Sequence, residues 1–141
     1  MSAESYDKKL AGEQTRRALT STLQCINGAI PLIGELADEF YRGPEQGTWV
    51  KLQKLIEYLE RINLSTGVVS NNKECIEGLD AYLDITLDMK DKVAELLKAM
   101  EKSDMVLMGD LLCYEIIPVL EAIRDAAGNI LKCGVDGNAS H

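Results

Sequence analysis

Apolar residues recur along the chain at intervals of three and four, which is the spacing of one face of an α-helix. From residue 19 onward, the apolar positions are Leu19, Leu23, Ile26, Ile30, Ile33, Ala37 and Phe40. The stripe keeps its phase on both sides of Pro31, which removes one backbone hydrogen bond and crowds the preceding turn. The pattern therefore predicts one helix with a kink at the proline.

Three further periodic segments follow, separated by short turns. Pro44 suits the first position of the second helix, and Asn71 begins a sequence that resembles the capping box of the third. Ser103 or Asp104 can cap the fourth helix, which runs towards Lys132. The segments predict an all-α fold, in the form of an antiparallel four-helix bundle with Pro-kinked first and fourth helices.

The length of the chain fits a single domain with its own core. We expect residues 1–133 to form this helical-bundle domain. The glycine-containing residues 134–141 predict a flexible C-terminal tail.

The fourth predicted helix has polar residues in an almost wholly apolar run. On a helical wheel its core side consists of Met108, Leu112, Ile116, Val119, Ile123 and Ala126. Glu115 falls beside these apolar positions, one turn before Pro118, whose ring disrupts the helix near the Tyr114 carbonyl. Tyr114 and Glu115 are therefore candidate buried polar residues, and we expect Glu115 to contact freed backbone groups or an arginine. Asp110 points away from the core side.

Four other apolar residues of this helix lie on flanks that one core stripe does not explain. They are Val106, Leu107, Leu111 and Ile117. A wide stripe buried between two neighbouring helices would cover some of them, and a dimer or partner interface would cover them equally well. They form the candidate interaction surface.

The charge of the chain is acidic, with 15 basic and 23 acidic residues and a formal net charge of −8. This balance repels phosphate backbones, so we expect no nucleic-acid partner. Carboxylates follow one face of the third helix at Glu77, Asp80, Asp84, Asp88, Asp91 and Glu95. Because this face lies opposite the apolar stripe, we interpret it as a solvated surface.

The residue types of catalytic and metal sites are scarce. The only histidine is His141, so the Glu-x-x-His pairs of di-metal bundles and His-based catalytic triads cannot form. The four cysteines are widely spaced and predict reduced, mostly buried thiols. We therefore expect no enzyme, no catalytic or metal-binding residues and no cofactor. The first residues lack a signal peptide's apolar run and no segment is apolar enough to span a bilayer, which favours a cytoplasmic protein without membrane contact.

The run from residue 103 to residue 120 resembles small uncharacterised helical proteins of bacteria. These proteins share an Asp-x-Val-Leu…Asp-Leu-Leu-x-Tyr-Glu-x-x-Pro-x-Leu pattern. It is matched here by Asp104, Val106, Leu107, Asp110, Leu111, Leu112, Tyr114, Glu115, Pro118 and Leu120. The resemblance implies a bacterial cytoplasmic protein and no particular activity.

Together these patterns predict a non-enzymatic protein–protein interaction module, acting as an adaptor, a small chaperone or a homodimer. The alternative is a small-molecule carrier or sensor with a ligand in the bundle core, oriented by Glu115 or Tyr114.

Overall fold

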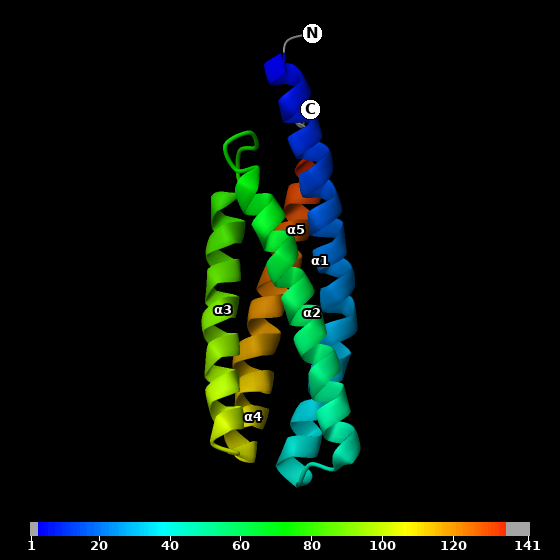
Figure 1. The fold of residues 1–141 in the computed structure, drawn as a ribbon, viewed down its shortest axis with the longest axis vertical. Coiled ribbons are helices and arrows are strands. Elements are labelled where there is room, and N and C mark those ends of the chain that lie inside the picture. The colour runs from blue at the N-terminus through cyan, green and yellow to red at the C-terminus, as the bar shows by residue number, and fades with distance from the viewer. Residues whose placement is uncertain (1–2, 135–141) are drawn as a thin grey trace.

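The computed structural model describes residues 3–134, which are α-helical apart from short turns and contain no strand. The helices are α1 (Ala3–Arg42), α2 (Gln46–Asn71), α3 (Asp80–Glu101), α4 (Met105–Leu111), the π-helical segment η1 (Leu112–Ile116) and α5 (Ile117–Cys133). Segments α4, η1 and α5 follow one another without a break and form one composite fourth helix. The prediction of an all-helical fold with four long helices is confirmed for the described residues (Figure 1).

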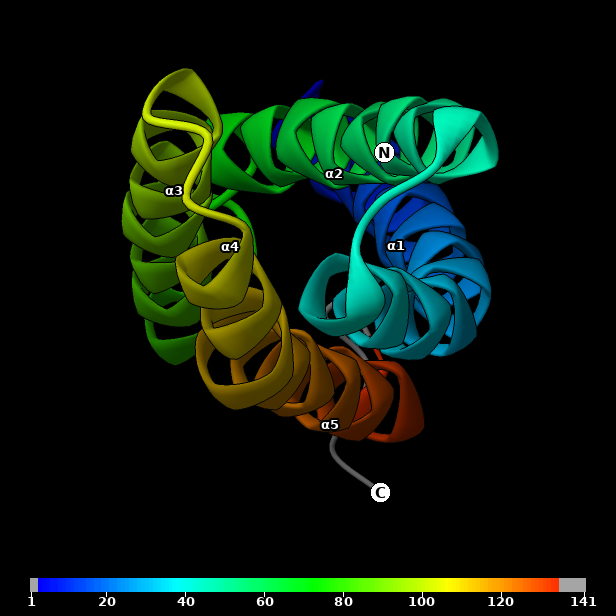
Figure 2. The ribbon, with the colours of Figure 1, turned by 90° about the horizontal axis from the view of Figure 1, so that it is seen from below.

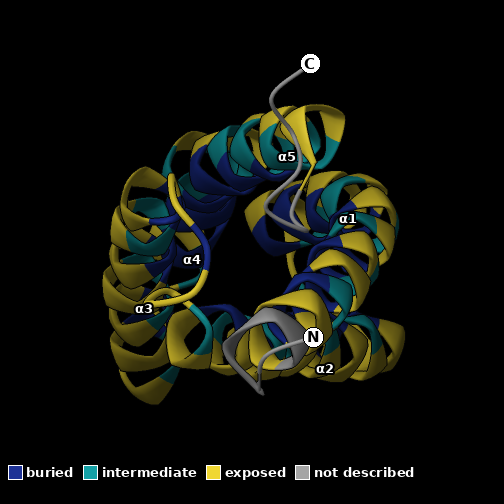
Figure 3. Ribbon diagram, turned by 90° about the horizontal axis from the view of Figure 1, so that it is seen from above, coloured by how far each residue is buried: buried dark blue, intermediate teal, exposed yellow. Residues whose placement is uncertain are grey.

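The four rods lie along one long axis and are joined by turns at its ends (Figure 1). Helix α1 packs along α2, and the composite fourth helix packs against both α1 and α3. Helices α2 and α3 contact each other over a much smaller area. Viewed from below, the four rods enclose the core (Figure 2). Buried residues line the inner faces and exposed residues the outer faces (Figure 3).

Of three helix starts predicted from the sequence, one is present in the structure and two are not. Asp104 caps α4 as expected, because its Oδ1 accepts a hydrogen bond from the Leu107 N–H at 3.1 Å. Pro44 lies in the turn rather than in α2, whose cap is the following residue, Glu45. Asn71 is the last residue of α2 and does not begin α3. Helix α2 extends this far because Val69 is fully buried and prolongs its apolar face.

Two glycines let a tyrosine ring from a neighbouring helix lie directly on the helix backbone. A Cβ at Gly28 of α1 would lie 2.7 Å from the phenolic oxygen of Tyr58 in α2. A Cβ at Gly109 of α4 would lie 2.7 Å from Cε1 of the Tyr41 ring in α1. Both distances are shorter than real side-chain contacts, so these close approaches require glycine.

The cysteines are less buried than the sequence predicts. All four are free thiols, but only Cys25 is buried, Cys113 is half-buried, and Cys75 and Cys133 are exposed. Cys75 lies in the turn between α2 and α3, and Cys133 is the last residue of α5. Of the predicted tail at residues 134–141, residues 135–141, which include His141, lie outside the described residues. Within the described residues, every helix is too short or too polar to cross a membrane.

Candidate functional site

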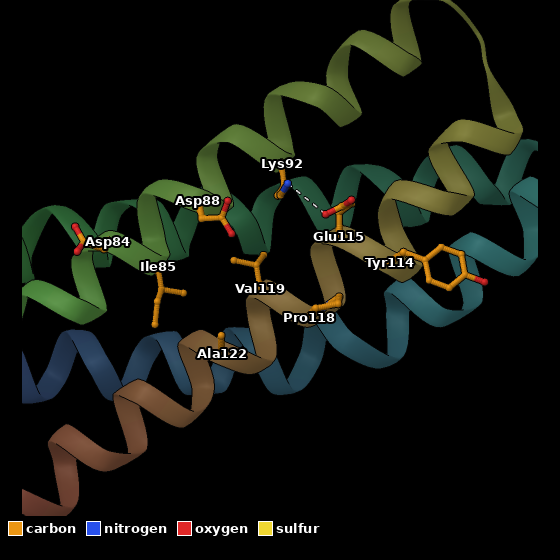
Figure 4. A pocket seen from close by; sticks show the side chains of 9 residues that line it. All are labelled: Asp84, Ile85, Asp88, Lys92, Tyr114, Glu115, Pro118, Val119 and Ala122. Carbon is orange, nitrogen blue, oxygen red and sulfur yellow. Dashed lines mark ion pairs between the residues drawn. The ribbon is translucent and has the colours of Figure 1, made fainter.

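A groove of about 400 Å³ runs between α3 and the second half of the composite fourth helix (Figure 4). We call it the α3–α5 groove. Its lining residues are Asp84, Ile85, Asp88, Lys92, Tyr114, Glu115, Pro118, Val119 and Ala122. Val119 is buried, and Ile85 and Ala122 are half-buried, so the floor is apolar. Three charged side chains, Asp84, Asp88 and Lys92, stand along the wall that α3 provides, and the fourth, Glu115, faces them from η1.

Glu115 forms an ion pair across this groove. Its Oε2 lies 3.2 Å from Nζ of Lys92 in α3 (Figure 4). The hydrogen bond to Glu115 raises the pKa of Lys92 above its usual value. The Glu115 side chain is 44% exposed, so the expectation of a buried carboxylate beside an arginine is wrong. Its partner is a lysine, and water reaches the pair.

The π-helical segment η1 explains why Glu115 lies at the surface instead of in the core. The Ile117 N–H bonds to the carbonyl of Leu112, five residues earlier, instead of the carbonyl four residues earlier. Pro118, which follows directly, has no N–H to offer. A π turn holds more residues than the 3.6 of an α turn, so it changes the phase of the helix. A wheel drawn at α-helical spacing therefore misplaces Glu115, although the predicted local distortion before Pro118 is present.

Tyr114 also lies at the surface, with 71% of its area exposed, so it is not a buried polar residue. It marks one end of the α3–α5 groove and points away from Glu115 (Figure 4). Helix-surface neighbours lie three or four residues apart, and consecutive residues project in different directions. Tyr114 and Glu115 thus diverge into different surroundings.

The candidate interaction surface divides into two parts. Val106 and Leu107 are 60% and 40% exposed, whereas Leu111 is buried and Ile117 is half-buried against the core. Leu111 is covered because α4 packs between α1 and α3, which buries a wide apolar stripe. The explanation of a wide stripe buried between helices thus holds for Leu111 and Ile117, whereas Val106 and Leu107 remain exposed.

An exposed or half-exposed row extends along the composite helix into the groove. Its members follow at intervals of four: Val106, Asp110, Tyr114, Pro118 and Ala122. Residues at this spacing share one helix face. We call it the fourth-helix row. The last three residues also line the α3–α5 groove, so row and groove form a continuous surface.

The electrostatics of the groove are acidic. Asp84 and Asp88 are exposed, and neither takes part in an ion pair within residues 3–134. Glu115 already neutralises Lys92. No group of three or more carboxylate, thiol or imidazole side chains in the described part of the chain is arranged to hold a metal ion. The groove can therefore offer two free carboxylates above an apolar floor.

The predicted acidic face of α3 is exposed along its whole length, as expected of a solvated face. Sequence reasoning missed that Asp84 and Asp88 are also part of a groove. They lie about 30 residues before Tyr114 and Glu115 in the chain, and no periodicity within one helix indicates which other helix they face. In the sequence, only the opposite charges of Lys92 and Glu115 indicate that α3 faces the fourth helix.

Comparison with known proteins gives one match. Residues 17–126 match a family model described as "Domain of unknown function (DUF8042)". This range covers 110 of the 141 residues and includes every residue of the α3–α5 groove. No curated protein and no solved structure is similar enough to the chain to count as a match.

Proposed function

We propose, from the premise that this chain belongs to the DUF8042 family, that it is a non-enzymatic protein–protein interaction module whose partner binds in the α3–α5 groove. The partner segment we infer is a basic amphipathic helix. The proposal rests on one observation, the combination of two unpaired carboxylates, Asp84 and Asp88, with an apolar floor.

Lysine and arginine side chains match such a groove because they combine an aliphatic stem with a cationic end. The stem would lie over Ile85 and Val119 while the cationic end meets Asp84 or Asp88. The formal net charge of −8 would also attract a basic partner before contact and keep acidic partners away. The same charge makes a homodimer through this acidic surface less favourable than a complex with a basic protein.

The dimensions favour a protein segment over a small molecule. The fourth-helix row runs from Val106 to Ala122, a rise of about 24 Å at 1.5 Å per residue, which is the length of a partner helix of several turns. The groove is open to solvent and would leave much of a small ligand uncovered, whereas ligand pockets bury most of the surface of their ligands. Exposed Val106 and Tyr114 would extend the contact beyond the groove.

The proposal also includes an antiparallel arrangement of the helices, kinks in the first and fourth helices, and a bacterial cytoplasmic location. The order of the helices and the turns at the ends of the long axis support an antiparallel bundle (Figure 1). Pro31 inside α1, and Pro118 directly after a π turn, support a kink in the first and fourth helices. The free thiols and the resemblance to bacterial helical proteins support a bacterial cytoplasmic module without nucleic-acid or membrane partners.

The test compares two variants with the same change in charge. Asp84→Asn/Asp88→Asn removes both free carboxylates of the groove, whereas Asp91→Asn/Glu101→Gln removes two exposed carboxylates of α3 outside it. Tagged proteins are used to capture partners from an extract of the source cell, and the mass of each complex is measured by light scattering. We expect the wild type and the control variant to capture a basic protein that the groove variant does not capture. This protein should dissociate as the salt concentration is raised.

Two results would contradict the proposal. One is a partner that binds the groove variant as well as the wild type. The other is a monomeric mass for all three proteins after capture, with no protein retained.

The carrier or sensor alternative has one observation in its favour, the buried hydroxyl groups of Thr22 and Tyr82 in the core. Glu115 and Tyr114 cannot orient a core ligand, because both side chains lie at the surface. A ligand that co-purifies with the wild-type protein, identified by native mass spectrometry, would favour this alternative.

A further inference from the structure

Lys92 is the one basic residue among those that line the α3–α5 groove, where it is accompanied by the carboxylates of Asp84, Asp88 and Glu115. Its Nζ lies 3.2 Å from Oε2 of Glu115, and both side chains are partly exposed. An ion pair that water reaches contributes little to folding stability. The effect of Lys92 is therefore to be sought in what the groove can bind.

The charged residues of the groove follow the spacing of a helix. Asp84, Asp88 and Lys92 succeed one another at intervals of four along α3 and so share one face, with a rise of about 6 Å at each step. Glu115 meets the third of these positions from the opposite wall, so three carboxylates follow along the groove in the order Asp84, Asp88, Glu115 (Figure 4). A partner helix with basic residues four apart presents its cationic groups at the same step.

Lys92 pairs with the third carboxylate and leaves the first two open. Asp88 lies four residues before Lys92, an arrangement that favours an ion pair within one helix. The lysine instead reaches across the groove to Glu115, and neither Asp84 nor Asp88 forms an ion pair with any described side chain. The groove thus offers two open acidic positions followed by one that is already neutralised.

This arrangement discriminates between partner helices by repulsion as well as attraction. Two basic residues four apart find the free carboxylates of Asp84 and Asp88. A third basic residue, one turn further along, meets the Lys92 ammonium, and like charges at this separation repel each other. Specificity is a difference between two affinities, so an element that weakens the wrong complex is as effective as one that strengthens the right complex.

We propose that Lys92 is the specificity-determining residue of the α3–α5 groove. It admits a partner helix with two basic residues four apart and disfavours one with a third basic residue at the next interval of four. Loss of the Lys92 charge frees Glu115 as a third acidic position and so changes the class of helix that binds best. This inference rests on the proposed function, the binding of a basic amphipathic helix in the groove.

The test uses two synthetic peptides of about 16 residues, long enough for a helix to form. Both contain the same leucines and three lysines, so their charge is equal. In the in-register peptide the lysines lie four residues apart on one face. In the off-register peptide the third lysine is moved to the opposite face. Each carries a fluorescent label, and fluorescence anisotropy gives its Kd for the full-length protein at one fixed salt concentration.

Three variants of Lys90 and Lys92 are compared with the wild type. We expect the wild type to bind the off-register peptide at least as tightly as the in-register peptide. Lys92→Met keeps the aliphatic stem without the charge and should bind the in-register peptide about threefold more tightly than the off-register one. Lys92→Arg should keep the wild-type preference. Lys90→Met is the matched control, since Lys90 is an exposed lysine of α3 outside this groove and its loss changes the net charge equally.

The outcomes separate this inference from the proposed function. Asp84→Asn/Asp88→Asn should abolish the binding of both peptides. If the peptides do not bind the wild type, or bind this variant equally well, the proposed function is wrong and the role of Lys92 falls with it. If binding does require Asp84 and Asp88 but Lys92→Met and Lys90→Met show the same ratio of Kd values, the groove function stands and the role of Lys92 is overturned.

Discussion

The phenolic oxygen of Tyr41, near the end of α1, lies 2.6 Å from Oδ1 of Asp110 in α4. The Tyr41 hydroxyl donates to this carboxylate, and its ring lies on the backbone of Gly109. The two residues are 69 positions apart in the chain, so the contact ties the first helix to the fourth. It also holds Asp110, a member of the fourth-helix row, in one orientation.

The Tyr41–Asp110 bond raises the pKa of Tyr41 above its usual value, because ionised Tyr41 would face the Asp110 carboxylate without a proton between them. In an ultraviolet titration, Asp110→Asn should lower the pKa of one phenol, and Tyr41→Phe should remove that transition. A pKa raised by folding contributes stability below the unfolded value near 10, and this contribution is lost as the pH rises through the folded value. Identical titrations of wild type and Asp110→Asn would contradict the assignment.

Glu39 joins the end of α1 to the start of α2. Its carboxylate accepts hydrogen bonds from Lys51 Nζ at 2.5 Å and from Thr48 Oγ1 at 2.6 Å, and the bond from Lys51 is the largest cause of its lowered pKa. The resulting stability is present above the unfolded pKa of about 4.5 and is lost as the pH falls through the folded value.

We therefore expect Glu39→Gln to have a lower Tm than wild type at neutral pH and a weaker dependence of Tm on pH below 4.5. The measurement is thermal unfolding by circular dichroism across this range. Glu60→Gln, at an exposed position of α2, is the control and should follow the wild-type curve. An unchanged acid dependence in Glu39→Gln would show that the hydrogen bonds contribute nothing.

Gly28 and Gly34 lie in the same helix but face different surroundings. Gly34→Ala should stabilise the protein by about 0.5–1 kcal/mol, because alanine restricts the unfolded chain and nothing lies within 4 Å of the new Cβ. Gly28→Ala places a Cβ against Tyr58 and should cost about 1–3 kcal/mol of overpacking. Urea unfolding measures both variants, and equal stability of the two would mean that Tyr58 moves aside freely.

Substitutions of Glu115 and Leu112 test whether the groove lies at the surface of the bundle. Leu112 is fully buried, so Leu112→Ala should lower the free energy of unfolding by about 2–5 kcal/mol. Glu115→Ala removes only a solvent-exposed ion pair and should change it far less. Equal losses in the two variants would indicate that Glu115 is buried and essential to the core.

The thiols should react in the order of their exposure. Cys75 and Cys133 are expected to react quickly with a chromogenic disulfide reagent in the native protein, Cys113 more slowly, and Cys25 only on unfolding. Cys75→Ser should remove one of the two fast equivalents. Fast reaction of all four thiols without denaturant would contradict the burial of Cys25.

The sequence determined the features that depend on neighbours within one helix. The 3.6-residue period identifies four helices because burying one face requires apolar residues at that spacing, and the same period places the α3 carboxylates in solvent. The Asp104 cap was readable because it depends on a residue only three positions away.

Tertiary structure decided the features that depend on which helices meet. Leu111 is buried because α4 packs between two helices, and no single-helix pattern contains that information. The π turn before Pro118 changed the helical phase, so Glu115 pairs with Lys92 at the surface instead of entering the core. The α3–α5 groove likewise combines residues from separate helices. Their positions follow from packing, since helical periodicity orients a side chain about its own axis but does not specify the neighbour it faces.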